Sequence, residues 1–281
     1  MKLFVNNLTN VDFSYLHAER GLLGESWLVQ LELDGSLDKQ GMICDFAIVK
    51  KRVKAWFDNS IDHALVVPSQ LEHLSTNIEG GYTQVGWKYP NGQTFSCRSP
   101  EQAIVFVDLP EVTLQTLAAW CEEQLLALFP DEIQGLSLRF VPEKIDGAYY
   151  HYSHGLQQHD GNCQRIAHGH RSMIEIYIDD ERDAALEAQW ADTFRDIYIA
   201  TDYHLENTTD HDYYHFAYTA AQGEFEIKLP KRVCYVMDTE TTVELIAEHL
   251  ANEIKAQKPE SHVRVVAYEG VAKGAIASRE A

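Results

Sequence analysis

The sequence predicts an α+β fold that is written twice along the chain, with antiparallel sheets and helices packed on one face. The first observation is an internal repeat, because residues 105–125 and 235–254 share a β-rich run, an acidic turn and an amphipathic helix. The second is the alternation of apolar and polar residues, as at 26–35, which is typical of a half-buried strand. The third is the element order expected in each copy, β-β-α-β-β-α-β, which is typical of the α+β class.

The first copy is expected to span residues 1–146. After the strand at 26–35, the stretch 41–59 predicts a short strand and then a helix. Asn91-Gly92 indicates a tight hairpin, and Thr113 is expected to cap the helix that follows it. Apolar residues recur at helical spacing in the first of these helices: Phe46, Val49, Val53 and Phe57.

The second copy is expected to span residues 147–281. Its strand at 170–180 matches the one at 26–35, and 181–196 has a helical pattern without repeating the first copy's sequence. Thr242 takes the capping position of Thr113. No long Gly/Ser/Pro linker separates the copies, so we expect them to pack together and to pair exposed sheet edges between copies or chains.

Composition excludes several classes of partner. The 281-residue chain carries a net charge of −20, which repels phosphate backbones and argues against general nucleic-acid binding. No apolar run approaches the ~20 residues that span a bilayer, and the N-terminus lacks an apolar signal core, so no membrane segment and a cytoplasmic location are expected. Five scattered cysteines are expected to be free thiols.

Three histidines form a candidate metal site in the second copy. His168 and His170 are two residues apart, and on a strand their imidazoles point to the same face. His154, on the preceding strand of the same hairpin, is a third candidate. Three His with an open fourth position is a catalytic zinc arrangement, although a His pair with this spacing is also compatible with a plain polar strand face.

Cys163 precedes the His pair in the sequence CQRIAHGH. It could be a fourth zinc ligand, which would make the site structural and closed. It could instead be a base or nucleophile beside the metal, where nearby positive charge favours the thiolate. A plain buried thiol is the third interpretation, and the spacing alone does not separate them.

The first copy lacks this histidine pattern. His17 matches His154 in position, but Leu23-Gly24-Glu25 stands where the second copy has His-Gly-His, so no zinc site is expected there. Asp62 and His63 are a candidate acid–base pair, although such a dipeptide is more often just a polar pair at a helix end. The alternative pairs are in the second copy: Asp202 with His204, and Asp210 with His211.

Taken together, these motifs resemble the 6-pyruvoyltetrahydropterin synthase / 6-carboxytetrahydropterin synthase family, which has the T-fold (tunnelling fold). The resemblance covers most of both copies and weakens at 66–104 and 181–235, where each copy carries an extra hairpin. The order of the motifs along the chain is more specific than any one of them. They are YHYSHGL, CQRIAHGH, GMICDFAIVKK with IDHAL, TTVELIA and VAYEG.

The resemblance implies a role for each candidate residue. His154, His168 and His170 would bind Zn²⁺, and Cys163 would act as a base assisted by an Asp-His pair. Glu269, and by repeat Glu143, would anchor the pterin ring. The substrate would be the small molecule 7,8-dihydroneopterin triphosphate.

The chain departs from the family pattern in ways that suggest a division of labour. The ordinary member is one copy long and assembles into rings, whereas here the second copy carries the zinc motif and the first carries Asp62 and His63. The spacing from Cys163 to His-Gly-His is also one residue longer than expected. We therefore predict a shared site at the contact between the copies, and a homo-oligomer of three tandem chains.

The predicted function is a zinc-dependent lyase, most similar to 6-carboxytetrahydropterin synthase on the route to queuosine and other 7-deazaguanines. The first alternative is 6-pyruvoyltetrahydropterin synthase activity. The second is a non-catalytic zinc-binding T-fold module that scaffolds another enzyme. A zinc hydrolase on an unrelated fold is disfavoured, because no glutamate is placed as a base by HEXXH-type spacing.

Overall fold

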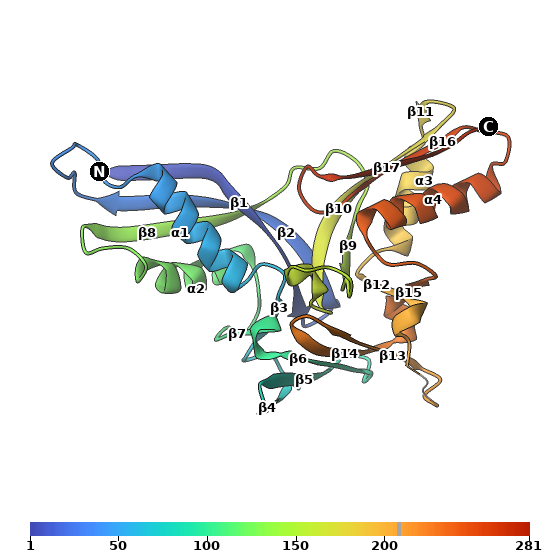
Figure 1. Cartoon of the computed structure of the whole chain (residues 1–281), viewed down its shortest axis with the longest axis horizontal. Helices are drawn as coiled ribbons and strands as arrows, with labels where there is room; N and C mark the ends of the chain where they lie inside the picture. Colours follow the sequence, from blue (N-terminus) through green and yellow to red (C-terminus); the bar gives the residue numbers. More distant parts are fainter. Residues whose placement is uncertain (207–208) are drawn as a thin grey trace.

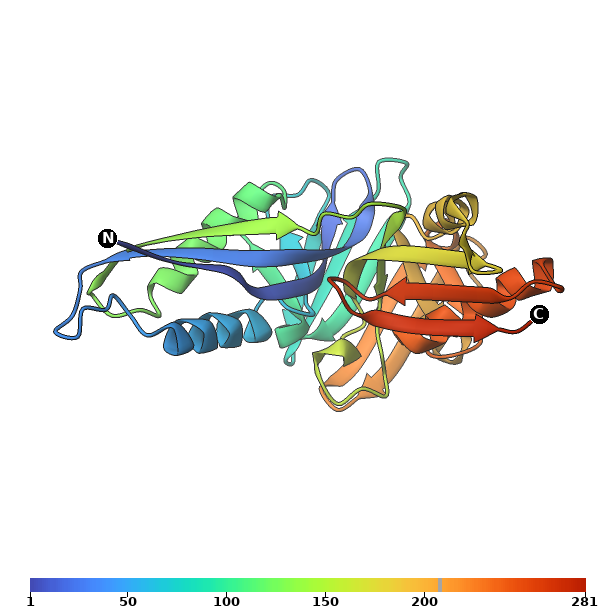
Figure 2. The same ribbon diagram turned by 90° about the horizontal axis from the view of Figure 1, so that it is seen from above.

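A computed structural model describes residues 1–206 and 209–281 of the chain. The molecule is elongated, with the two copies end to end and the chain termini at opposite ends (Figure 1, Figure 2). Each copy has a sheet covered by two helices. Within the described residues, none of the helices is long and apolar enough to cross a membrane.

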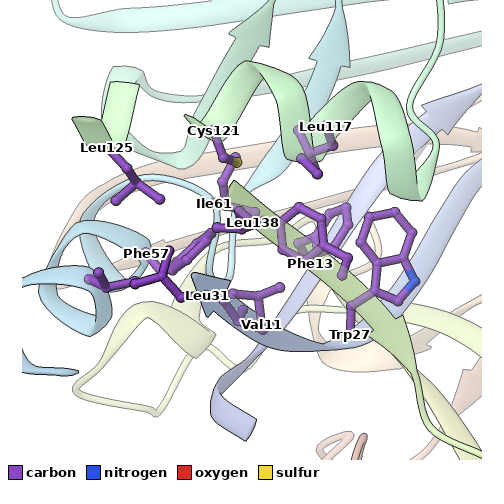
Figure 3. Close-up of a cluster of buried hydrophobic side chains, with 14 of the residues drawn as sticks. Val11, Phe13, Trp27, Leu31, Phe57, Ile61, Leu117, Cys121, Leu125 and Leu138 are labelled. Atoms are coloured by element: carbon purple, nitrogen blue, oxygen red, sulfur yellow. The ribbon is translucent and has the colours of Figure 1, made fainter. Parts of the chain in front are cut away.

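The first copy's sheet has five strands in the order β7-β3-β1-β2-β8. Its helices, α1 and α2, share one buried cluster with β1, β2 and β8 and therefore cover the same face of the sheet (Figure 3). The strands are β1 (Lys2–His17), β2 (Gly21–Gly35), β3 (Leu65–Pro68), β7 (Ile104–Val107) and β8 (Ile133–Pro142), and the helices are α1 (Phe46–Asn59) and α2 (Leu114–Leu126).

The second copy's sheet follows the same plan, with the order β15-β12-β9-β10-β16-β17 and the short β11 on β10. Helices α3 and α4 pack together with β9, β10 and β16 in another buried cluster. The strands are β9 (Tyr149–His154), β10 (His168–Ile178), β11 (Glu181–Arg182), β12 (Ile197–Thr201), β15 (Cys234–Met237), β16 (Val263–Tyr268) and β17 (Gly274–Arg279), and the helices are α3 (Ala184–Thr193) and α4 (Val243–Gln257).

Three strands of the first copy and a hairpin of the second join in a third sheet, in the order β13-β14-β6-β5-β4. Strand β14 pairs antiparallel with β6, so the copies are hydrogen-bonded to each other across this sheet. This pairing covers edges that either part alone would expose. The strands are β4 (Ser75–Glu79), β5 (Tyr82–Lys88), β6 (Thr94–Pro100), β13 (Tyr213–Ala220) and β14 (Gly223–Pro230).

The predicted α+β tandem fold is confirmed, with some differences of detail. The hairpins are antiparallel, but β3, β7, β12 and β15 pair in parallel, so the sheets are mixed. Thr113 and Thr242 cap α2 and α4 as predicted. The short strand expected at the start of 41–59 is wrong, because Asp45 caps α1 after a turn and Phe46 is exposed rather than in the core. All five cysteines are free.

Strand register shows which residues of the two copies correspond. Ser14 pairs with Leu65 on the parallel strand β3, and Ser153 pairs with Tyr198 on β12. Leu65 and Tyr198 in turn pair with the first residues of β7 and β15. Ser14 and Ser153 are therefore counterparts, and their hydroxyl oxygens lie 2.7 Å apart where the two hairpins meet.

The two hairpins approach each other closely because of a glycine on each. A Cβ atom added to Gly24 would lie 1.9 Å from the carbonyl oxygen of Tyr152, and one added to Gly169 would lie 2.6 Å from Gly24 Cα. Neither position has room for a side chain. The backbones of β2, β9 and β10 can therefore lie in contact, which places the first copy's loops against the second copy's histidines.

Replacing Gly24 by Ala is expected to lower the free energy of unfolding by about 3 kcal/mol, because the clash is with backbone atoms that cannot rotate away. Chemical denaturation measures the change. Gly135→Ala on β8 is the control, since its Cβ would meet only the Asp34 side chain at 3.5 Å. Equal stability of the two variants would contradict the close contact of the hairpins.

Candidate metal and acid–base site

The three candidate histidines converge at the end of the β9-β10 hairpin where the loop of residues 155–167 connects the two strands. His154 lies directly across from His168, and His170 lies two residues further along β10. Each side chain is at most 1% exposed. One ligand atom from each histidine lies within 4.8 Å of the others, a separation that a single ion can bridge. The structure thus brings together the set that the sequence proposed.

Hydrogen bonds orient two of these rings. His154 Nδ1 donates to the carbonyl oxygen of Thr241 at 2.9 Å, and His168 Nδ1 donates to that of Arg165 at 2.9 Å. Their Nε2 atoms are left to donate electron pairs to an ion. His154 Nε2 and His170 Nε2 are buried and have no hydrogen-bond partner among the described residues. Orphaned buried nitrogens of this kind fit a metal ion.

The protonation state of the rings also suits metal binding. Burial holds the pKa of His154 and His168 well below the ordinary value, and the neighbouring imidazoles lower it further. Both rings are therefore neutral near pH 7, as ligation requires.

An Asp-His pair from the first copy lies beside this cluster. Asp62 Oδ2 accepts a hydrogen bond from His63 Nδ1 at 2.7 Å, and the His63 ring centroid is 5.0 Å from that of His168. His63, Cys163 and His168 form a second group whose ligand atoms lie within 4.8 Å of one another. The two groups overlap at His168, so the thiol and the Asp-His pair adjoin the three histidines.

The environment of His63 favours its charged form. Burial alone would lower the pKa of His63, but hydrogen bonds and charge interactions with Asp62 and Cys163 outweigh it and raise the pKa to about 10. With Nδ1 held by Asp62, Nε2 is the nitrogen available to Cys163. This chain of thiol, imidazole and carboxylate can hold and relay a proton.

Glu269 directly follows β16 of the second copy. Its Oε2 is 3.9 Å from Lys273 Nζ, which also lies 3.4 Å from Asp12 Oδ2. Glu143 is not the counterpart of Glu269, because Phe140 of β8 and Ala267 of β16 hold the same place in the strand registers of the two sheets. Glu269 therefore corresponds to Pro142.

Glu143 is one residue further along than Pro142. Its carbonyl oxygen accepts from Arg171 Nη1 at 2.8 Å, and its Oε2 is buried without a partner among the described residues.

The alternative Asp-His pairs do not join the histidine cluster. His204 Nε2 is bonded to Gln157 Oε1 at 2.9 Å, and Asp202 precedes it in a short 3-10 turn. Asp210 Oδ2 accepts from Lys228 Nζ at 2.8 Å, with His211 next in the chain. Neither pair belongs to a metal-capable group among residues 1–206 and 209–281.

The first copy's counterpart of the site has different chemistry. Tyr15 pairs with Leu23 as His154 pairs with His168, so Tyr15, and not His17, takes the place of His154. Glu25 takes the place of His170. His17 lies beyond, at the strand end, where its Nδ1 accepts from the Glu19 and Arg20 backbones.

An ion pair lies at this counterpart of the site. Arg20 Nε donates to Asp196 Oδ2 at 2.8 Å, and its Nη2 donates to the other carboxylate oxygen at 2.5 Å. Asp196 occupies the position of His63, and both residues have φ of 55°. Since Arg20 comes from the first copy and Asp196 from the second, a salt bridge joins the copies here.

Asp12 is the residue of the site that the sequence reasoning missed. It is 1% exposed and belongs to the first copy, yet its Oδ1 lies 3.4 Å from Nδ1 of His170. Burial would raise the pKa of Asp12, but His170, Lys273 and Ser26 together hold it well below the ordinary value. The available signal was a carboxylate inside an apolar strand, in the sequence NVDFSY.

Replacing Glu25 by Gln is expected to stabilise the protein at pH 8 by up to about 3 kcal/mol and to change little at pH 5. Burial raises the pKa of Glu25 from 4.5 to about 7, despite a hydrogen bond from Ser26 and the charge of Arg171. The folded state therefore retains this proton longer than the unfolded state. The stability that the wild type loses as pH rises from 4.5 through 7 is not lost by the Gln variant.

Thermal unfolding at the two pH values measures this difference. His151, which faces Glu25, has a pKa lowered to about 4 by burial and stays neutral at both. The exposed Glu79 on β4 provides the control substitution to Gln. A gain for Glu25→Gln that is equal at pH 5 and pH 8 would contradict the raised pKa.

Comparison with known proteins places both copies in one family. The family model described as 6-pyruvoyl tetrahydropterin synthase matches residues 13–146 and again 144–280. A protein of Pyrococcus abyssi, named "Putative 6-carboxy-5,6,7,8-tetrahydropterin synthase", is 24% identical over 129 residues, which is 46% of this chain and 73% of the relative. A Pyrococcus horikoshii protein of the same name is 28% identical over 116 residues, covering 41% and 65%.

Solved structures of two 6-pyruvoyltetrahydropterin synthases also align with this chain. The Plasmodium vivax enzyme has 16% identity and a TM-score of 0.39, and the alignment covers 51% of this chain and 98% of that one. The Plasmodium falciparum enzyme has 15% identity with the same TM-score and coverage. The family resemblance inferred from the motifs is confirmed by the two family-model matches.

Proposed function

The chain belongs to the 6-pyruvoyl tetrahydropterin synthase family in both of its halves, and on this premise we propose that it is a zinc-dependent lyase acting on the side chain of 7,8-dihydroneopterin triphosphate. The observation that carries the proposal is the contact between three buried histidines of one copy and the Asp62–His63 pair of the other, with Cys163 close to His63 and His168. A binding module would not need the acid–base pair.

The three histidines would hold the ion through ring nitrogens that the protein otherwise leaves unpaired. Bound zinc would supply a Lewis acid for the hydroxyl and carbonyl groups of the substrate side chain. Tetrahedral zinc with three protein ligands leaves a position for the substrate. Cys163 would then serve as a base and not as a fourth ligand.

Cys163 would remove a proton from the side-chain carbon of the substrate, and His63 would hold the thiolate by charge and hydrogen bonding. Asp62 keeps the His63 ring in place, because its Oδ2 binds Nδ1 and its Oδ1 accepts from the Asp12 backbone at 2.9 Å. Glu269 would accept the N–H groups of the pterin ring. Glu143 corresponds to no anchor position in the register and is a weaker candidate for that role.

The favoured reaction is the 6-carboxytetrahydropterin synthase type, on the queuosine and 7-deazaguanine route, because both Pyrococcus relatives carry that name. The second candidate is 6-pyruvoyltetrahydropterin synthase activity, which the family description names. Three tandem chains would supply the six copies of an ordinary ring, which is the assembly we propose.

The zinc-loaded protein is expected to consume 7,8-dihydroneopterin triphosphate. Chromatography of the pterin products measures this reaction. Cys163→Ala and His63→Ala should each lower kcat by at least about 100-fold, the scale of a lost acid–base group, while keeping their zinc. An equimolar mixture of the two should stay inactive, because both residues of one site come from the same chain.

Full activity of His63→Ala would contradict a site shared between the copies. A wild-type protein that binds zinc and consumes no substrate would instead support the non-catalytic module that scaffolds another enzyme. Asp210→Asn is the control for a general charge effect, since its carboxylate pairs with Lys228 outside the cluster.

A further inference from the structure

Asp12 lies between the two parts of the proposed site. It is on β1 of the first copy, and its side chain points across the contact between the copies toward His170 of the second. Its backbone, in turn, holds the Asp62–His63 pair of its own copy. Asp12 therefore contacts both parts of the proposed site.

The carboxylate of Asp12 is fixed by donors from both copies. The Ser26 hydroxyl donates to Oδ1, and Asn10 Nδ2 donates to Oδ2 at 3.0 Å. Lys273 Nζ of the second copy lies 3.4 Å from Oδ2. Oδ1 is thereby held facing the imidazole of His170.

His170 differs from the other two histidines in what orients it. His154 and His168 each donate Nδ1 to a backbone carbonyl. His170 Nδ1 is buried, has no hydrogen-bond partner among the described residues, and lies 3.4 Å from Asp12 Oδ1. A carboxylate on the far nitrogen of a ligating imidazole fixes its tautomer and makes it a stronger ligand.

The backbone of Asp12 positions the acid–base pair. Its N–H donates to Asp62 Oδ1 at 2.9 Å, and its carbonyl oxygen accepts from the His63 N–H at 2.7 Å. His63 has φ of 55°, a left-handed conformation that is strained for a non-glycine residue. The hydrogen bond to Asp12 helps to hold His63 in that conformation.

The counterpart site shows the same pairing with the partners exchanged. His151 is the counterpart of Asp12 in the second copy, and it faces Glu25, the counterpart of His170, at 3.5 Å. An imidazole and a carboxylate thus meet across the contact at both places. This position is one where the strand geometry brings such a pair together, whichever copy provides the carboxylate.

We propose that Asp12 is a positioning residue that orients His170, across the contact between the copies, for metal binding. The role rests on the proposed function only in assuming that the three histidines bind a metal. Substituting the side chain leaves both backbone hydrogen bonds in place. Metal binding can therefore be tested separately from the alignment of Asp62 and His63.

The test measures zinc affinity by competition with a chelator, and the absorption spectrum of the Co²⁺-substituted protein. Asp12→Asn is expected to weaken zinc binding by about 10- to 100-fold and to shift the Co²⁺ bands, with circular dichroism unchanged. Asp34→Asn, on a surface-exposed carboxylate of the same sheet, should match the wild type. His154→Ala should abolish tight binding.

Wild-type affinity together with an unchanged Co²⁺ spectrum in Asp12→Asn would overturn the positioning role while leaving the proposed function intact. A wild-type chain that binds no zinc would overturn both. Should Asp12→Asn fail to fold, Ser26→Ala removes the hydroxyl that orients the carboxylate and should weaken zinc binding measurably, by no more than the ~10- to 100-fold expected for loss of such a partner. Unchanged affinity in Ser26→Ala would then count against the role.

Discussion

The close backbone contact between the two hairpins is the constraint on which the rest of the site depends. Gly24 lies against the backbone of Tyr152 and His170, and only a residue without Cβ fits there. This contact brings a loop of the first copy, with Asp62 and His63, onto the histidines of the second. A carboxylate buried on β1 can then reach His170. If a side chain separated the two hairpins, each copy would hold only part of the site.

Tandem linkage allows the two positions related by the repeat to carry different residues. In an assembly of identical chains every site carries the same residues, whereas here each copy can change independently. One position has the three histidines, with Asp12 beside His170. The other has Tyr15, Leu23 and Glu25 in place of the histidines. There the Arg20–Asp196 ion pair joins the copies, at the place that His63 and Cys163 take in the first position. Glu25 is buried at this second position, and burial raises its pKa to about 7.

Sequence patterns predicted the elements of this molecule well and, of the contacts between the copies, the one that brings Asp62 and His63 to the second copy's histidines. The repeat, the capping threonines and the His-x-His spacing on a strand are local signals, and they indicated the tandem fold and the three histidines. The match of His17 with His154 was wrong, because the shorter first hairpin shifts the pairing so that Tyr15 lies opposite Leu23. Asp12 was missed for a different reason. Its partners are 158 and 261 residues away, and only the packing of the copies brings them together.

X-ray absorption at the zinc edge tests the central claim most directly, because the two metal-capable groups share His168 and differ in sulfur. The account predicts about one zinc per chain with nitrogen and oxygen ligands near 2.0–2.1 Å and no sulfur shell. That result would leave Cys163, His63 and Asp62 free for proton transfer. A sulfur ligand at about 2.3 Å would place Cys163 on the ion and contradict its role as the base.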